Sequence, residues 1–176
     1  DVKDAEALLV RSVTVVNESL IQNTALKYVG SATIGTDHLD IQALEKHNIT
    51  WANAAGCNAQ AVAEYVITAL LHLDASLLEQ QEKFTLGIVG LGNIGKRLAR
   101  LARALNMNII GFDVIPIDPE FAKEVGLMKA DLDTLLQSAD YVSLHVPLLD
   151  STKNLINAQR MSTMKKTAKI INTSRG

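Results

Sequence analysis

Three observations on the 176-residue sequence predict an α/β fold with a doubly wound parallel sheet. Short apolar runs alternate with helical segments along the chain, which is typical of parallel strands joined by crossover helices. The composition, 48% hydrophobic but only 4% aromatic, suits a close-packed protein rich in Val, Ile, Leu and Ala. Neither an internal repeat of solenoid length nor a low-complexity linker interrupts the alternation.

The first part of the chain is expected to contain three apolar strands, at residues 7–12, 26–32 and 49–54. The segment TDHLDIQALEKHN, between the second and third strands, is interpreted as helix or turn. This βαβ rhythm predicts a small parallel sheet. We interpret residues 1–58 as part of a flavodoxin-like substrate lobe.

A long helix is predicted over roughly residues 59–79, and we expect the domain boundary within or beside it. The residues that recur in it at spacings of three and four are Ala61, Tyr65, Thr68, Ala69 and His72. Its apolar residues exceed what one buried face needs, so we expect the protein to pair as a homodimer. The second lobe would then comprise residues 59–176.

The alternation of strands and helices resumes after this helix. The expected elements are strand 85–90, helix 93–106, strand 108–113, a short helix near 119–125, helix 131–138, strand 140–146, helix 157–164 and strand 168–173. Together they predict a parallel sheet with helices on both faces.

Three glycines lie between the predicted strand 85–90 and the helix that follows it. Gly90, Gly92 and Gly95 form the pattern G-x-G-x-x-G, in which the first glycine permits a tight turn and the second lets a pyrophosphate approach the backbone. The third allows close packing of helix on strand, and the helix N-terminus then faces the phosphates. The alternative, a helix that merely packs tightly through its glycines, does not account for the acidic residue described next.

Asp113 ends the second predicted strand of this lobe, at about the distance from Gly90 expected for the acid that binds a ribose. Its negative charge would repel a 2′-phosphate, and the next residues, Val114 and Ile115, offer no arginine to receive one. The sequence therefore predicts a Rossmann-type lobe that binds NAD in preference to NADP.

Charge and composition exclude several classes of partner. The 17 basic and 19 acidic residues give a net charge of −2 and are spread along the chain, so nucleic acid and anionic membranes are not expected partners. The most apolar stretch, AVAEYVITALLHLDASLL, contains Glu64, His72 and Asp74 and is interpreted as a buried helix. A single cysteine, Cys57, and the lack of a signal-peptide pattern predict a cytoplasmic protein, and no metal site is expected. Because the chain starts without Met and stops after NTSRG, we expect it to be part of a longer protein.

Two polar residues lie at the carboxyl ends of the last two predicted strands, His145 within strand 140–146 and Arg175 after strand 168–173. His145 titrates near neutrality when unperturbed and is a conceivable base, but we interpret it as a wall or packing residue of the cofactor crevice. Arg175 follows the strand 168–173, where its planar guanidinium would be suited to hold a carboxylate. On physical grounds alone, a surface salt bridge explains Arg175 equally well.

The segments GIVGLGNIGKRLARLARALNMNIIGFD, ADYVSLHVPLLDSTKNLI and KIINTSRG resemble the cofactor domain of the D-isomer-specific 2-hydroxyacid dehydrogenases. The resemblance covers residues 84–176. Upstream, VRSVTVVNESL, VGSATIGTDHLD and GCNAQAVAEYV are most similar to one member of this family that acts on a phosphorylated D-2-hydroxy acid. This resemblance implies hydride transfer between C2 of such an acid and NAD, with the substrate bound between the two lobes. It also implies a homodimer whose subunits pair through their cofactor lobes.

The resemblance also implies roles for individual residues. Arg175 would orient the substrate carboxylate, Ser12 and Thr33 would contact substrate, and Arg11 would bind a phosphate or carboxylate. The residues that match positions lining NAD, besides the glycines, are Asn93, Ile94, Asp113, Val146, Thr173 and Ser174. The glutamate and histidine that move the hydroxyl proton in this family lie downstream of the arginine strand, beyond Gly176.

Three alternatives stay open from the sequence. The segment LLDSTKNLINAQRMSTMKK is more similar to the phosphoglycerate and glycerate dehydrogenases of the same family, which leaves the substrate open. Transcriptional corepressors that sense NAD share the fold and the arginine. A nucleotide-binding methyltransferase shares the glycine pattern, although Gly95 and NTSRG favour a dehydrogenase.

Overall fold

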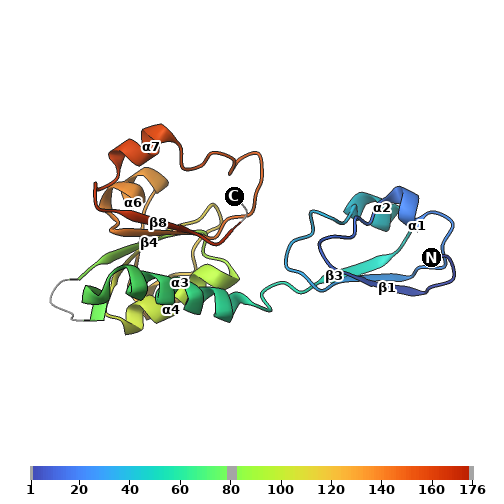
Figure 1. Ribbon diagram of the computed structural model, residues 1–176, viewed down its shortest axis with the longest axis horizontal. Coiled ribbons are helices and arrows are strands. Elements are labelled where there is room, and N and C mark those ends of the chain that lie inside the picture. The colour runs from blue at the N-terminus through green and yellow to red at the C-terminus, as the bar shows by residue number, and fades with distance from the viewer. Residues whose placement is uncertain (1, 79–82, 175–176) are drawn as a thin grey trace. The chain divides into compact units, whose positions relative to one another are not determined.

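The computed structural model describes residues 2–78 and 83–174. It divides the chain into two compact units, Asp1–Cys57 and Asn58–Gly176, each with its own hydrophobic core (Figure 1). Arg175, predicted to bind the substrate carboxylate, lies outside the described residues.

The first unit is a three-stranded parallel sheet in the order β1-β2-β3. Its elements are β1 (Ala7–Val10), α1 (Glu18–Ile21), β2 (Tyr28–Ser31), α2 (Ile41–Lys46) and β3 (Thr50–Asn53). Val16, Ile21, Val29 and Leu44 form the centre of its core. The three strands agree with the sequence prediction, whereas the four-residue α1 was not predicted.

Helix α2 begins at Ile41, because the Asp40 carboxylate accepts a hydrogen bond from the Ala43 amide at 3.0 Å and caps the helix there. His38 therefore lies in the preceding turn, not in a helix.

The second unit is a five-stranded parallel sheet in the order β6-β5-β4-β7-β8. Its strands are β4 (Thr85–Val89), β5 (Asn108–Phe112), β6 (Leu127–Lys129), β7 (Tyr141–Leu144) and β8 (Lys169–Asn172). Its helices are α3 (Ala59–Leu73), α4 (Asn93–Ala104), α5 (Pro119–Val125), α6 (Leu132–Ser138) and α7 (Ala158–Thr163). Strand order reverses between β4 and β7, and in such sheets ligands bind at the carboxyl ends of the strands beside this reversal.

Each face of the sheet carries a separate core, because successive side chains of a strand point to opposite faces. Ile88 of β4 packs with Leu98 of α4 and Val66 of α3, whereas Val89 packs with Leu135 of α6. Figure 1 shows α3 and α4 beneath one face of the sheet and α6 and α7 above the other. The predicted Rossmann-type doubly wound sheet is confirmed.

Two details of the second unit differ from the prediction. The edge strand β6 was not expected, since its three residues are too few to give a period. The long helix ends at Leu73, because the Asp74 carboxylate accepts hydrogen bonds from the Ser76 amide and hydroxyl and starts a 3-10 turn, Ala75–Leu78. The Tyr141 hydroxyl donates to the same carboxylate at 2.6 Å and fixes this end of α3 to the sheet.

Within residues 2–78 and 83–174, no helix has the length and apolar character needed to cross a bilayer. The same residues contain no group of three or more His, Cys, Asp or Glu side chains placed to hold a metal ion.

Candidate functional site

The turn between β4 and α4 depends on two glycines. Gly90 has a φ of +94°, a region that L side chains rarely adopt, and a Cβ built on it would lie 2.7 Å from the His145 carbonyl oxygen. A Cβ on Gly95 would lie 2.1 Å from the Gly90 carbonyl oxygen. Close packing of the turn against the end of β7 and against α4 therefore explains both residues.

Gly92 differs from the other two glycines of the motif. Its φ is −74°, and a Cβ built on it would meet no atom within 4 Å. Packing within the described chain does not require a glycine here. The open space beside the backbone at Gly92 is suited to a ligand that approaches the chain closely, as a pyrophosphate does in dinucleotide sites.

The N-terminus of α4 has no side-chain cap. Helix α3 shares this feature, whereas Asn or Asp side chains cap α1, α2, α5, α6 and α7. Gly92 is the N-cap residue of α4, and the first turn, which begins with the predicted residues Asn93 and Ile94, contains no acidic side chain. Uncapped N–H groups and the positive end of a 12-residue helix favour an anion at this position.

Asp113 lies beside this turn and holds it. One carboxylate oxygen accepts a hydrogen bond from the Leu91 amide at 2.6 Å, and the other accepts from the Ile115 amide at 2.9 Å. The carboxylate thus joins the end of β5 to the glycine turn after β4. Since each carboxylate oxygen has two lone pairs, Asp113 retains acceptor capacity for ribose hydroxyls.

The carboxyl end of β7 forms the other side of the glycine turn. The His145 amide donates to the Val89 carbonyl oxygen at 2.8 Å, and Val146 packs near Gly90. The His145 ring is largely buried, with Nε2 2.8 Å from the Ser143 hydroxyl and Nδ1 3.3 Å from the Thr173 hydroxyl. Burial lowers the pKa of His145 from 6.5 to about 4, so the imidazole is neutral at physiological pH. This environment favours the packing role over that of a base.

The last described residues complete this edge of the sheet. Thr173 contacts His145 as above, and the Ser174 hydroxyl donates to the Leu144 carbonyl oxygen at 3.0 Å. The structure therefore brings together the ends of β4, β5, β7 and β8, with every predicted cofactor residue on or beside them. Their contacts with a cofactor remain predictions.

In the first unit, the three predicted substrate residues follow the carboxyl ends of two neighbouring strands. Arg11 and Ser12 are exposed and follow β1, while Thr33 is half-buried and follows β2. The Ala32 amide donates to the Val10 carbonyl oxygen at 2.9 Å, so the two strand ends are adjacent. Their substrate contacts also remain predictions.

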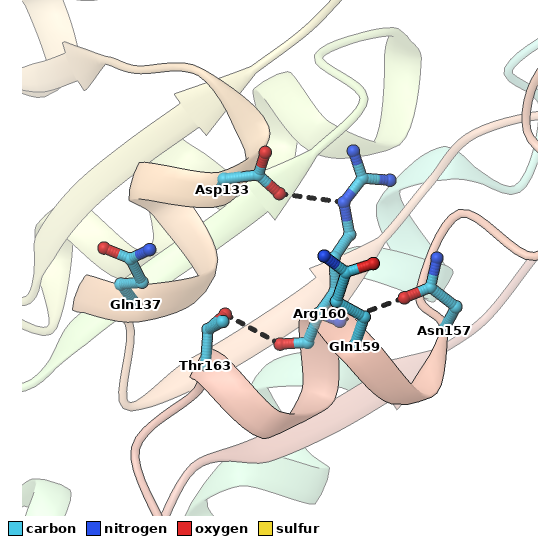
Figure 2. A pocket seen from close by; sticks show the side chains of 6 residues that line it. All are labelled: Asp133, Gln137, Asn157, Gln159, Arg160 and Thr163. Atoms are coloured by element: carbon cyan, nitrogen blue, oxygen red, sulfur yellow. Dashed lines mark hydrogen bonds and ion pairs between the residues drawn. The ribbon is translucent and has the colours of Figure 1, made fainter.

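A separate hollow of about 420 Å³ lies between α6 and α7 (Figure 2). Its lining residues are Asp133, Gln137, Asn157, Gln159, Arg160 and Thr163. Arg160 is engaged there by the Asp133 carboxylate at 2.8 Å and by the Leu155 carbonyl oxygen at 2.8 Å. Of the predicted substrate and cofactor residues that fall within 2–78 and 83–174, none lines this hollow.

Residues 57–176 match the NAD-binding domain of the D-isomer specific 2-hydroxyacid dehydrogenases. The chain belongs to this family. An erythronate-4-phosphate dehydrogenase of Acinetobacter baumannii is 66% identical over all of the chain and 49% of its own length. That of Psychrobacter cryohalolentis is 42% identical over 97% of the chain and 49% of its own length. The chain thus spans about half the length of these curated relatives.

Solved dehydrogenases of this family have the same fold. The apo form of Rhodotorula graminis D-mandelate dehydrogenase superposes with a TM-score of 0.82 at 31% identity, over 98% of this chain and 60% of that one. Aquifex aeolicus D-lactate dehydrogenase, complexed with NAD and lactic acid, superposes with a TM-score of 0.81 at 29% identity, over 99% of this chain and 58% of that one. The resemblance stated from the sequence is confirmed, and erythronate-4-phosphate dehydrogenase is the member that the upstream segments resemble.

The cofactor of this domain in the family is NAD, and the glycine turn fits it. Open space at Gly92, an uncapped helix behind it and a carboxylate at the neighbouring strand end are the features that a dinucleotide needs.

Sequence reasoning missed two features of these sites. It placed Asp113 toward a ribose but did not foresee its hydrogen bond to Leu91. It also assigned no role to His38, although the imidazole is 4% exposed and bonded to Ser31 beside Thr33. No local pattern signals either contact, since each joins residues through the tertiary fold.

Proposed function

We propose that the protein is an NAD-dependent oxidoreductase that transfers a hydride between C2 of 4-phosphoerythronate and the nicotinamide of NAD, so that the hydroxy acid is oxidised to the 2-oxo acid as NAD is reduced, or the reverse. The observation that carries this proposal is the 66% identity to an erythronate-4-phosphate dehydrogenase, which extends over both units of the chain. The likeness therefore includes the loops after β1 and β2 as well as the glycine turn.

In this proposal the second unit binds the cofactor. The first-turn amides of α4 bind the pyrophosphate beside Gly92, and Asp113 accepts ribose hydroxyls while it holds the turn through Leu91. Val146, Thr173 and Ser174 line the remaining edge. Bound NAD supplies the acceptor for the hydride that leaves C2.

Arg175 would orient the substrate carboxylate with two parallel hydrogen bonds and stabilise negative charge on the substrate oxygens. The hydroxyl proton would pass to the histidine that the family carries downstream of this arginine, oriented by a glutamate. We assign His145 no part in this step, because its ring nitrogens lie 2.8 Å from the Ser143 hydroxyl and 3.3 Å from the Thr173 hydroxyl.

The first unit would bind the substrate phosphate. Arg11 supplies an exposed guanidinium after β1, Ser12 and Thr33 supply hydroxyls, and all three follow strand ends that lie side by side. A phosphate needs such a combination of charge and donors. Phosphoglycerate carries the same group, so it is the alternative substrate of the same class.

Kinetics of the full-length enzyme with Arg11→Ala test this assignment. We expect kcat/KM for 4-phosphoerythronate to fall about tenfold or more, as loss of a charge-assisted contact removes roughly 1.5–3 kcal/mol, and kcat/KM for unphosphorylated erythronate to change little. Lys27→Ala is the matched control, since Lys27 is an exposed cation before β2 that pairs with Glu6. Equal losses for both substrates would mean that Arg11 serves the carboxylate or the fold.

Three further points belong to this proposal. We infer that the reaction serves pyridoxal phosphate biosynthesis, as the resemblance to the vitamin B6 pathway member implies. A single cysteine, exposed in the described structure, accords with a cytoplasmic location. The exposed apolar side chains of α3 support a homodimer.

A further inference from the structure

A chain of hydrogen bonds runs from a buried histidine to Thr33. His38 Nε2 lies 2.9 Å from the Ser31 hydroxyl oxygen, and that oxygen lies 2.7 Å from the Thr33 hydroxyl oxygen. His38 is 4% exposed and Ser31 is 5% exposed, so the first two members are shielded from solvent, while Thr33 is half-buried at the carboxyl end of β2. These hydrogen bonds therefore link the core of the first unit to the proposed phosphate site.

The other ring nitrogen of His38 fixes the direction of this chain. Nδ1 is buried and has no hydrogen-bond partner within the described residues. A buried N–H without an acceptor is rarer in proteins than an acceptor without a donor, so the tautomer with the proton on Nε2 is favoured. Nε2 then donates to Ser31, and the Ser31 hydroxyl donates to the Thr33 oxygen.

Thr33 is consequently left as a donor. Its hydroxyl hydrogen has the Gly35 carbonyl oxygen as acceptor, at 3.3 Å, which is long for a hydroxyl hydrogen bond. A phosphate oxygen is a stronger acceptor, and a donor that is itself polarised by an incoming hydrogen bond suits an anion.

The backbone around Thr33 is held by the neighbouring strand. Asn53, at the end of β3, donates its side-chain amide to the Ile34 carbonyl oxygen at 2.6 Å, and the Ala54 amide donates to the Thr33 carbonyl oxygen at 3.1 Å. With both the backbone and the hydroxyl fixed, the orientation of Thr33 is set before any ligand arrives, which lowers the entropy that binding must overcome.

We propose that His38 and Ser31 are positioning residues that present the Thr33 hydroxyl as a hydrogen-bond donor to the phosphate of the substrate. The inference rests on the proposed function, because it takes the phosphorylated hydroxy acid as the ligand. It adds two residues that do not touch the substrate and act only through Thr33.

A double-mutant cycle in the full-length enzyme tests this relation. We expect Ser31→Ala and Thr33→Val each to raise KM for 4-phosphoerythronate about fivefold to tenfold with little change in kcat, because the phosphate lies away from the reacting carbon. If Ser31 acts only through Thr33, Ser31→Ala adds no further loss in the Thr33→Val background. His38→Gln, whose side-chain amide can donate as Nε2 does, should retain a lower KM than His38→Leu.

Two controls separate positioning from folding. Thr24→Val removes another half-buried hydroxyl of the first unit, which donates to the Ile21 carbonyl oxygen at 2.7 Å, and should leave KM unchanged. Unfolding midpoints of all variants show whether an effect on KM is a stability effect.

The outcomes distinguish the inference from the function on which it rests. Additive losses in the double mutant, or a fall in kcat with KM unchanged, would overturn the positioning role while leaving the substrate assignment intact. Absence of turnover of 4-phosphoerythronate by the wild-type enzyme would remove the proposed function and this inference with it.

Discussion

At the scale of single residues, the three glycines of the turn after β4 serve different needs. Gly90 and Gly95 are required by the fold, since a Cβ on either would lie within 3 Å of a backbone oxygen. Packing in the described chain does not require a glycine at position 92, where a Cβ would meet no atom within 4 Å and the residue is the N-cap of the uncapped helix α4. The same motif therefore contains residues for packing and a residue for the ligand.

Alanine substitutions should separate these roles. Gly92→Ala should cost no more than about 1 kcal/mol of stability, because alanine is less favourable than glycine at an N-cap but its Cβ meets no atom, yet it should weaken NAD binding at least tenfold. Gly95→Ala should cost about 1–3 kcal/mol of stability, because the helix must move away from Gly90. Chemical denaturation and calorimetric NAD titration measure the two effects. A destabilised Gly92→Ala variant with normal NAD affinity would contradict the assignment.

Asp113 should control the choice between NAD and NADP. The wild-type enzyme is expected to bind NAD at least tenfold more tightly, since the carboxylate repels a 2′-phosphate. Asp113→Asn removes the charge but keeps an oxygen that can accept from Leu91, so NADP affinity should rise while the turn stays in place. Asp113→Ala removes both and should weaken both cofactors. Equal affinities of the wild type for NAD and NADP would refute this reading.

What the sequence predicts at this scale depends on whether the signal is local. The spacing of Gly90, Gly92 and Gly95 and the place of Asp113 at a strand end can be recognised along the chain. The contact of Asp113 with Leu91, and that of His38 with Ser31, join segments whose proximity only the folded chain determines.

At the scale of elements, the carboxyl ends of strands carry the candidate sites in both units. Most elements were predictable from their apolar period, and the short helix expected near 119–125 is α5 (Pro119–Val125), which begins after Asp118 and ends at Gly126. Strand β6 and helix α1 were not predicted, because three or four residues are too few to show a hydrophobic period.

The start of helix α3 was predicted correctly, but the helix ends at Leu73, before the expected residue 79, and the residues whose spacing predicted it do not form its buried face. Its buried face is formed by Ala59, Ala63, Val66 and Leu70. Ala61, Tyr65, Thr68 and His72, which share the same spacing, are exposed in the described chain. Both sets of residues recur with the helical repeat, so the sequence alone does not show which of the two faces of the helix is buried.

The end of β7 should give the protein a pH-dependent stability. Burial lowers the pKa of His145 from 6.5 to about 4, so between these values the unfolded chain binds a proton that the folded chain does not. Stability should therefore fall as the pH falls from about 6.5, by at most about 1.4 kcal/mol per pH unit. Urea denaturation at pH 7 and pH 5 should show a smaller fall for His145→Gln than for wild type. His72 is exposed, so His72→Gln is the control and should lose as much stability as the wild type between pH 7 and pH 5. An equally large loss of stability in His145→Gln would contradict the assignment.

At the scale of the whole molecule, the chain consists of two units whose hydrophobic cores do not share residues. The first unit carries the proposed phosphate site with its buried positioning residues, and the second carries the cofactor turn. Because the cores are separate, we expect a core substitution in one unit to leave the packing of the other core unchanged.

Self-association is the last expectation, and it rests on the exposed side of α3. Tyr65 is 65% exposed there and Leu73 53%, and a two-fold contact would bury this apolar surface. The full-length enzyme should sediment as a dimer at micromolar concentration, with a two-fold contact in which α3 meets its copy. Tyr65→Glu should weaken the dimer at least tenfold, because an aromatic anchor is replaced by a charge. Met128→Glu is the matched control, as Met128 is 58% exposed on the edge strand β6 of the same unit and should leave the dimer intact. A wild-type monomer at that concentration, or equal effects of the two substitutions, would exclude α3 as the interface.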